Sequence, residues 1–454
     1  MDSAISAMDD TDRALVHALQ LAPRASWERL APVLGTRPDT LARRWERLTA
    51  SGDAWASALA LRTGVHAPSM AWIEVTCAAG SAPGVGRALT GDPHALRVEH
   101  VTGGRDLLLY VVVPDLPGLY RYLSCRVQRI PGVVGTRTSM VTAVHYGPDR
   151  WRLDQLTPAQ SAQLAPLGQG SRALPAAAPG AAPMTEGDRP LAMALARDAR
   201  RSVASLAREL DMSESTVRRR LARLEAAGAL HFECVLAHVH SGWPVSATLW
   251  AEVAEHEVPE CAATAAGLRE TRACMSTTGP WNLVVTARLR AVEDLSRYTA
   301  ELTRRLPALR VADTAVSLYV RKSTAQELDR QGRRVRCVTP DIWSDPAPGA
   351  GDETPLSPDS RAGPTGPSRP RRSEPAPPVR AGPAGPSRPH QPEPNPPARA
   401  GPTTPSRRAP PAPAPSRRAP PVPAPSRPLS APAPLRLHHQ RQHPRPPLPA
   451  HPGG

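Results

Sequence analysis

The side chains best suited to contacting another molecule lie between positions 213 and 223, where hydroxyl and guanidinium groups alternate with aliphatic residues. On a helix with about 100° per residue, Val217, Leu221 and Leu224 fall on one side. The polar residues of the opposite side are Ser215, Thr216, Arg219 and Arg223. Arginine can donate two hydrogen bonds to the O6 and N7 atoms of guanine, and Arg, Ser and Thr can bind phosphate oxygens. The pattern predicts a DNA-reading helix in preference to one whose charges are only solvated.

Further residues around this segment are expected to hold the DNA backbone. Arg218 and Arg220 flank the polar face, and Ser213 stands where an N-cap is needed. Arg200 and Arg201 precede the second of three short helices near its N-terminus, where phosphate groups are favoured.

A matching but weaker polar face occurs near the start of the chain. It consists of Asp39, Thr40, Arg43 and Arg47, and Arg24 takes the place of Arg200. Because the acidic Asp39 replaces Ser215, we expect the first helix to bind DNA less well or differently.

Both patterns belong to one internal repeat with an offset of 176 positions, which aligns Arg43 with Arg219 and Thr102 with Thr278. A fixed offset held over about 130 residues indicates duplication of one unit. Repetition of the arginine-rich helix in both copies strengthens the DNA-binding interpretation, and we expect the two copies to fold together as an intramolecular pseudo-dimer.

Each copy contains two parts. In the second copy, helical spacing of apolar residues predicts three short helices near 189–197, 203–210 and 214–226. The part that follows has the order βαββαβ, which is the ferredoxin-like arrangement. Its strands are expected near 245–254, 270–278, 283–290 and 309–321, and its helices near 257–267 and 291–306. We therefore predict an α+β protein in which a winged helix-turn-helix and a βαββαβ domain each occur twice.

The predicted domain boundaries follow from the repeat and from composition. They are helix-turn-helix units at 8–62 and 188–238, βαββαβ domains at 68–150 and 244–325, a linker at 151–187 and a tail at 340–454. Most of the 56 prolines lie in the tail, and Trp343 is its only aromatic residue. Such a segment cannot bury enough apolar surface to offset the entropy of ordering, so we expect it to be disordered. It is either a plain spacer or a basic, sequence-independent DNA tether.

The bulk composition argues against several other classes of protein. The formal net charge is +15, and the six cysteines include no C-x-x-C pair, which argues against a zinc site or a disulfide framework. No catalytic residue, metal or cofactor is expected. No apolar run approaches the roughly 18 residues of a membrane-spanning helix, and the first residues are acidic where a signal peptide would be basic. We expect a cytoplasmic protein with no membrane partner.

At this level of detail the chain resembles the Lrp/AsnC (leucine-responsive regulatory protein) family of bacterial transcriptional regulators. The resemblance is carried by the L-A-x-x-L motif at 206–210, S-x-S-T-V-x-R-R at 213–220 and R-L-E-x-x-G at 223–228. The motif T-G-x-x-D at 102–106 and its counterpart T-G-x-x-N at 278–282 resemble the family's effector domain.

The resemblance implies a transcriptional regulator whose effector domains pair through their sheets and bind a small ligand, typically an amino acid. The residues implied in ligand binding are Gly103, Asp106, Gly279 and Asn282, although both glycines also fit tight turns between strands. It further implies double-stranded DNA as a partner, and we expect additional self-association.

Two other functions share this architecture. An architectural protein would bridge DNA without a ligand, and a siroheme decarboxylase resembles the same unit while acting as an enzyme. The enzyme would need basic residues around a tetrapyrrole, for which His94, His100 and His145 are candidates. The arginine-rich helix favours the regulator over both.

Overall fold

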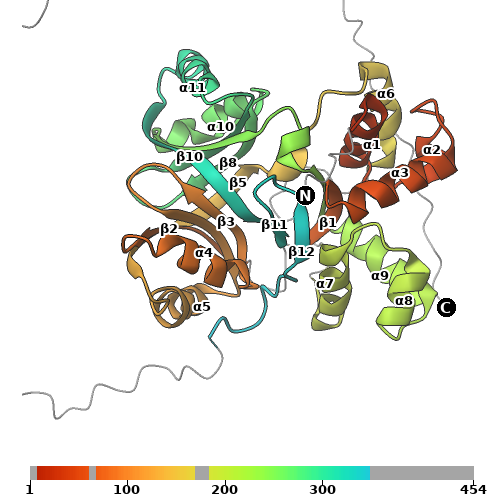
Figure 1. Ribbon diagram of the computed structural model, residues 1–454, viewed down its shortest axis with the longest axis horizontal. Coiled ribbons are helices and arrows are strands. Elements are labelled where there is room, and N and C mark those ends of the chain that lie inside the picture. The colour runs from red at the N-terminus through yellow and green to blue at the C-terminus, as the bar shows by residue number, and fades with distance from the viewer. Residues whose placement is uncertain (1–7, 61–67, 169–183, 348–454) are drawn as a thin grey trace, which may run out of the picture. The chain divides into compact units, whose positions relative to one another are not determined.

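The computed structural model describes residues 8–60, 68–168 and 184–347 (Figure 1). These residues belong to the first of two units of the chain, which extends from Met1 to Pro364. Residues 348–454 of the tail predicted at 340–454, and residues 169–183 of the predicted linker, lie outside the described residues.

Each copy begins with three helices, as the apolar spacing predicts. In the first copy they are α1 (Asp10–Leu21), α2 (Trp27–Leu30) and α3 (Pro38–Ala50), and in the second α7 (Arg189–Arg197), α8 (Val203–Glu209) and α9 (Glu214–Ala226). The helix starts follow capping chemistry: the Asp9 carboxylate accepts a hydrogen bond from the Asp12 backbone N–H, and the Ser202 hydroxyl from that of Ser205. Both helix-turn-helix units are confirmed.

A strand follows each helix-turn-helix unit, and the two strands pair with each other. β1 (Ala54–Ala60) runs antiparallel to β6 (Leu230–Leu236). At the centre of this pair Ser57 faces Glu233, and these two positions correspond under the 176-residue offset. A pseudo-twofold axis therefore passes through this pair, as in a self-complementary dimer interface.

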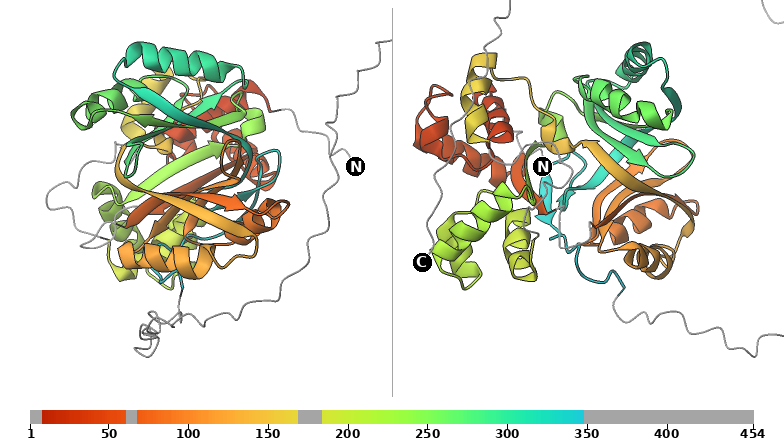
Figure 2. Two further views of the ribbon diagram at one scale, coloured as in Figure 1. Left: turned by 90° about the vertical axis from the view of Figure 1, so that its left-hand side faces the viewer. Right: turned by 180° about the vertical axis from the view of Figure 1, so that it is seen from behind.

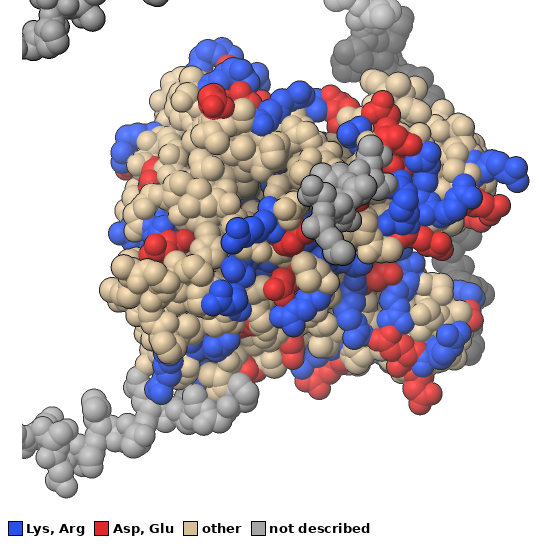
Figure 3. Space-filling view, viewed as in Figure 1, with Lys and Arg blue, Asp and Glu red and all other residues tan. Residues whose placement is uncertain are grey.

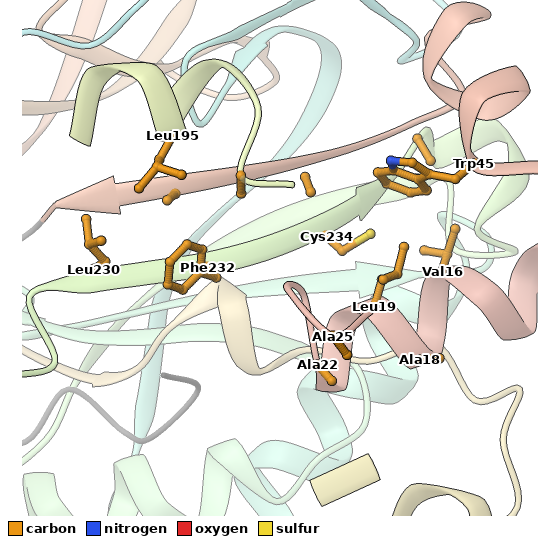
Figure 4. Packing of buried hydrophobic residues seen from close by; sticks show 14 of the residues in the cluster. Val16, Ala18, Leu19, Ala22, Ala25, Trp45, Leu195, Leu230, Phe232 and Cys234 are labelled. Carbon is orange, nitrogen blue, oxygen red and sulfur yellow. The ribbon is translucent and has the colours of Figure 1, made fainter. Parts of the chain in front are cut away.

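The strand pair gives both helix-turn-helix units one shared hydrophobic core. Helix α1 packs against β6 of the other copy, and α7 packs against β1. Figure 4 shows Val16 and Leu19 of α1 beside Cys234 of β6, with Leu195 of α7 near Leu230 and Phe232 at the other end of the same strand. The exchange of strands means that neither unit completes its core alone.

The second part of each copy is the predicted βαββαβ domain. In the first copy the elements are β2 (Ser69–Cys77), α4 (Ala82–Thr90), β3 (Ala95–Val101), β4 (Leu107–Val113), α5 (Leu116–Arg121), a π-helical turn (Tyr122–Val127) and β5 (Val133–Tyr146). In the second they are β7 (Val245–Glu252), α10 (Val258–Ala266), β8 (Thr271–Thr277), β9 (Leu283–Leu289), α11 (Asp294–Arg305) and β10 (Arg310–Ser323). The strand orders β3-β4-β2-β5 and β8-β9-β7-β10 are both ferredoxin-like, which confirms the fold class.

The two sheets close into one barrel-like ring. β5 pairs with β2 along its first half and with β8 of the other copy along its second half, and β10 bridges β7 and β3 in the same way. Figures 1 and 2 show α4 and α5 outside one side of the ring and α10 and α11 outside the other. Residues alternate along each strand, so that Ile73 packs under the helices while Trp72 and Trp250 join a core inside the ring. The predicted pseudo-dimer is thus built within one chain.

The segment predicted as a linker contributes to the fold. Helix α6 (Pro158–Leu164) begins at a capping box formed by Thr157 and Gln160, and Leu156 and Leu164 are buried in the helix-turn-helix core. Short 3₁₀ turns lie at Pro148–Arg150, Ala165–Leu167, Glu186–Asp188, His238–His240 and Glu255–Glu257.

The chain remains ordered past the predicted end of the second domain. β11 (Gln326–Leu328) and β12 (Arg334–Cys337) extend the sheet from β10, and the backbone N–H of Arg334 bonds to the Gly52 carbonyl. Ile342 is 1% exposed and packs on Leu96 and Val112. The predicted tail start at 340 is therefore too early. Ile342 and Trp343 pack against the first βαββαβ domain, and these two apolar residues dock the segment although prolines surround them. No helix in the described ranges is long and apolar enough to cross a bilayer.

Candidate nucleic-acid interface

Helix α9 presents the polar face that the sequence predicts. Val217, Leu221 and Leu224 are buried in the shared core. On the other side Ser215, Arg218 and Arg219 are exposed and Thr216 is partly exposed. The helical wheel therefore separates the buried and exposed sides of this helix correctly, apart from the residues discussed below.

Hydroxyl groups gather at the N-terminus of α9. The Ser213 side chain accepts a hydrogen bond from the Thr216 backbone N–H and lies 3.0 Å from the Ser215 hydroxyl and 2.9 Å from that of Thr216. The cap fixes the start of the helix and leaves exposed hydroxyls beside it.

The two exposed arginines of α9 differ in their surroundings. Arg218 forms an ion pair of 2.8 Å with Glu214 one turn earlier, and both side chains are about half exposed or more. Arg219 has no hydrogen-bonding partner within the part of the chain that the structure describes. Its guanidinium is therefore available to a ligand without the loss of an internal contact.

The last two predicted arginines of this helix bind within their own unit. Arg223 forms an ion pair with Asp188, which is 1% exposed, and Arg220 donates to the Gly187 carbonyl. Burial disfavours the charged form of Asp188, but hydrogen bonds from Arg223 and Thr185 outweigh it and hold the pKa of that carboxyl below its usual value. We therefore revise the role of Arg223 and Arg220 to clamping α9 onto the start of α7.

The first copy repeats this division of roles. Arg47 pairs with the buried Asp12 at 2.6 Å, as Arg223 does with Asp188. On the outer face Asp39 and Arg43 are exposed and Thr40 is partly exposed. Arg37 replaces Ser213 and makes no side-chain cap, so the start of α3 lacks the hydroxyl cluster of α9.

Arg24 and Arg200 lie between the two helix-turn-helix units rather than at the surface predicted to meet phosphate. Arg200 donates to the carbonyls of Pro23 at 2.6 Å and Ala25 at 3.0 Å, and its guanidinium lies 3.9 Å from the ring centre of Trp27. Arg24 donates to the carbonyl of Ala199 across the same junction. The two contacts are related by the pseudo-twofold axis. The prediction that Arg24 and Arg200 contact phosphate is wrong, because their guanidinium groups already donate to backbone carbonyls of the other unit.

Arg201 also faces its own unit, where it pairs with Glu209 and donates to the Ser205 hydroxyl at 2.9 Å. Exposed arginines of the helix-turn-helix units that were not predicted include Arg29, Arg37 and Arg208. Aligning the copies would have pointed to Arg37, which stands at the position of Ser213. Figure 3 shows arginine side chains along the helix-turn-helix side of the molecule, interspersed with acidic ones.

The four residues predicted to bind a ligand lie in loops at the seam between the two βαββαβ domains. Thr102 exchanges hydrogen bonds with the backbone of Val316, and Thr278 does the same with Met140. Gly103 and Gly279 have φ angles of +98° and +111°, which favour glycine.

The acidic and amide residues at the ends of these loops bind the adjoining strands. The Asp106 carboxylate accepts from the Cys77 backbone N–H at 2.7 Å, and Asn282 accepts from that of Val253 at 3.0 Å. All four positions therefore have a structural role at the seam, and ligand binding there stays a prediction.

The three histidines considered for tetrapyrrole chemistry have separate partners. His94 lies 3.1 Å from the Ser344 carbonyl, His145 lies 2.7 Å from the Ser276 hydroxyl, and Arg321 donates to the His100 ring at 3.0 Å. The contacts of His145 and His100 occupy equivalent places in the two halves. No group of three or more potential metal ligands occurs among the described residues.

Comparison with known families matches both parts of the repeat. The AsnC-type helix-turn-helix domain matches residues 8–49 and 184–225, and the Lrp/AsnC ligand binding domain matches 70–147 and 246–327. Together these matches cover more than half of the chain.

Individual relatives are more distant. An uncharacterized HTH-type transcriptional regulator of Pyrococcus horikoshii is 27% identical over 140 residues, which cover 30% of this chain and 87% of the relative. A counterpart in Pyrococcus abyssi is 24% identical and covers 31% of this chain and 89% of the relative.

Among solved structures, AsnC of E. coli is 20% identical, with a TM-score of 0.25, and covers 30% of this chain and 93% of that one. The siroheme decarboxylase NirDL is 16% identical, with a TM-score of 0.47, and covers 69% of this chain and 93% of that one.

Proposed function

We propose that this chain, which belongs to the Lrp/AsnC family of transcriptional regulators, binds double-stranded DNA sequence-specifically through α9, with α3 making weaker contacts. The observation that carries the proposal is the exposed guanidinium of Arg219, which has no partner among the described residues. Arg219 is exposed at the middle of a well-capped helix whose opposite side is core, and no described residue competes for its guanidinium.

The remaining DNA contacts follow from the same exposed surface. The DNA backbone beside α9 would be contacted by Ser213, Ser215, Thr216 and Arg218. On α3, Thr40 and Arg43 would make the corresponding contacts to DNA. Ser and Thr hydroxyls and guanidinium groups suit phosphate oxygens, whereas the freely placed Arg219 suits a base edge. Because the two units are fused about a pseudo-twofold axis, the proposed site has two unequal half-sites.

Regulation by a small molecule is part of the proposal in the form that the family implies. An amino acid or similar ligand would bind at the seam loops of Gly103, Asp106, Gly279 and Asn282. Since these loops join the two domains, a ligand there would change how firmly the halves are held. Further association of whole chains would present several such DNA-binding surfaces together.

The experiment compares DNA affinities for the purified full chain. A pool of random duplexes is selected over several rounds, and the affinities of the selected and unselected duplexes are measured by fluorescence anisotropy at 150 mM salt. A sequence-specific regulator binds the selected duplex roughly 1000-fold or more tightly than the unselected one. Equal affinities would instead indicate an architectural DNA-bridging protein.

A further inference from the structure

A cavity inside the barrel-like ring has no role in the DNA-binding proposal. It contains about 710 Å³ of space free of protein atoms, a volume that includes open solvent. Its walls are mainly apolar and come from both βαββαβ domains and from β1. They include Leu59, Trp72, Leu96, Tyr110, Val144 and Met275.

Two arginines, Arg97 and Arg272, also line this cavity. Arg97 donates to the Glu99 carboxylate and, at 3.2 Å, to the Ser246 hydroxyl. Arg272 is only 6% exposed, and it has no ion-pair partner among the described residues. The Glu99 carboxylate therefore neutralises the charge of Arg97, whereas no carboxylate of the described residues pairs with Arg272.

A second cavity adjoins the first. It encloses about 440 Å³ and shares Pro148 and Arg272 with it. Arg288 and Glu233 line the second cavity, and both are 8% exposed. Arg272 thus stands where the two spaces meet.

The buried charges around the cavities do not balance. The guanidinium groups of Arg97, Arg272 and Arg288, with the partly exposed Arg152 beside them, outnumber the two carboxylates of Glu99 and Glu233. Burial and the neighbouring Arg97 lower the pKa of Arg272 to about 10, which still leaves it charged at neutral pH. An unpaired buried charge is costly, so a further anion would be bound favourably here.

Another arginine inside the ring has its charge paired by the protein itself. Arg105 is equally buried, but it forms ion pairs with Glu74 and Asp313, and its guanidinium lies 4.2 Å from the ring centre of Trp250. Arg272 has no equivalent set of partners, although carboxylates occur elsewhere in the ring.

We propose that the inner cavity binds a small organic acid, whose carboxylate pairs with Arg272 and whose apolar body lies against Trp72, Tyr110 and Met275. The planar guanidinium matches a carboxylate with two parallel hydrogen bonds, and Arg97 stands beside it as a second donor. This site is separate from the seam loops of Gly103 and Gly279, and binding at it does not require DNA.

The test is isothermal titration calorimetry of the full chain at pH 7.5 with three probes that combine a carboxylate and an apolar body. The probes are phenylacetate, indole-3-acetate and octanoate. At least one should bind saturably, whereas acetate, which lacks the body, and phenylacetamide, which lacks the charge, should bind at least 10-fold more weakly. Failure of all three probes to bind, or equal binding of phenylacetamide, would overturn the proposal without affecting the DNA-binding proposal.

Three variants locate the site. Arg272→Met should weaken the binding probe by roughly 10- to 100-fold, because it removes charge-assisted hydrogen bonds. Arg272→Lys, which keeps the charge, should retain part of the affinity. Arg297→Met is the control, since that side chain is 75% exposed on the outer helix α11. Unchanged affinity in Arg272→Met would contradict the assignment.

The melting temperature gives a second readout in the absence of a probe. Removing an unpaired buried charge should raise the melting temperature of Arg272→Met, whereas Arg105→Met should lower it by leaving Glu74 and Asp313 unpaired. A lower melting temperature in Arg272→Met would mean that the protein itself neutralises this arginine, which would also overturn the proposal.

Discussion

Arg219 and Arg223 lie one turn apart on α9, yet they have different roles because of their neighbours. Arg223 reaches the buried Asp188 at the start of α7, while Arg219 has open surroundings. The helical wheel predicted that both would point away from Leu221, and it could not show that α7 would bring a carboxylate to one of them. The sequence therefore predicts the outer face of the helix but not which of its charges are already paired.

The Arg223–Asp188 pair makes a measurable contribution to stability. Arg223→Met leaves the Asp188 carboxylate buried with only Thr185 as a side-chain donor, and we expect it to lower the free energy of unfolding by about 1–3 kcal/mol. Urea denaturation measures this quantity. Arg218→Met is the matched control on the same helix, since exposed ion pairs contribute about 0–1 kcal/mol. Equal losses in the two variants would argue against the clamp.

The same pair predicts a pH dependence. Because the pKa of Asp188 is lowered in the folded state, its contribution is fully present above the unfolded value of about 3.9 and is lost as the pH falls toward the folded value. The stability difference between the wild type and Asp188→Asn should therefore narrow as the pH falls from 6 to 3. Urea denaturation across this range measures it, and a constant difference would be inconsistent with the lowered pKa.

At the scale of elements, local patterns predicted the three helices of the second helix-turn-helix unit and the helices and four strands of the second βαββαβ domain well, but not β6, β11 or β12. The apolar run Leu283–Leu289 and the amphipathic Asp294–Arg305 both lie where periodicity places them. Local patterns did not predict which strands pair with each other. β1 pairs with β6 across 176 residues of chain, and β5 and β10 each change partner midway, because these choices depend on burial in the assembled fold rather than on local sequence.

The centre of the β1–β6 pair offers a test of the pseudo-twofold axis. In a dimer of identical units the residue at this place would face its own copy, whereas here the Ser57 hydroxyl donates to the Glu233 carboxylate at 3.2 Å. Ser57→Glu would place two buried carboxylates opposite each other and should lower the free energy of unfolding by about 1–3 kcal/mol at pH 7. Ser57→Gln, of similar size, is the control. If both variants lost the same stability at pH 7, size rather than charge would be responsible.

At the scale of the whole molecule, the 176-residue repeat was sufficient to predict a pseudo-dimer, since two copies with complementary faces can pair within one chain. The sequence did not reveal how closely the halves are joined. Arg24 and Arg200 bind carbonyls of the opposite unit, and residues 338–347 return to cover the first βαββαβ domain. Arginines at a domain junction and arginines on a DNA-binding surface look alike in a sequence, so Arg24 and Arg200 were placed on the wrong surface.

The returning segment should stabilise the molecule even though it lies in a proline-rich stretch. Ile342→Ala removes a side chain that is 1% exposed against Leu96 and Val112, and we expect a loss of about 2–4 kcal/mol in the free energy of unfolding. Val335→Ala, at a side chain that is 63% exposed, should change it by less than about 0.5 kcal/mol. A similarly small effect for Ile342→Ala would show that the segment is not docked in solution.

The most direct test of the account is to repeat the DNA selection with Arg219→Ala and Arg43→Ala beside the wild type. The wild type should select a site with one strong and one weak half. Arg219→Ala should lose the preference at one base pair of the strong half and bind the wild-type site more weakly by roughly 1–3 kcal/mol, while Arg43→Ala keeps that preference. If Arg219→Ala selects the same bases with the same affinity, α9 does not read DNA.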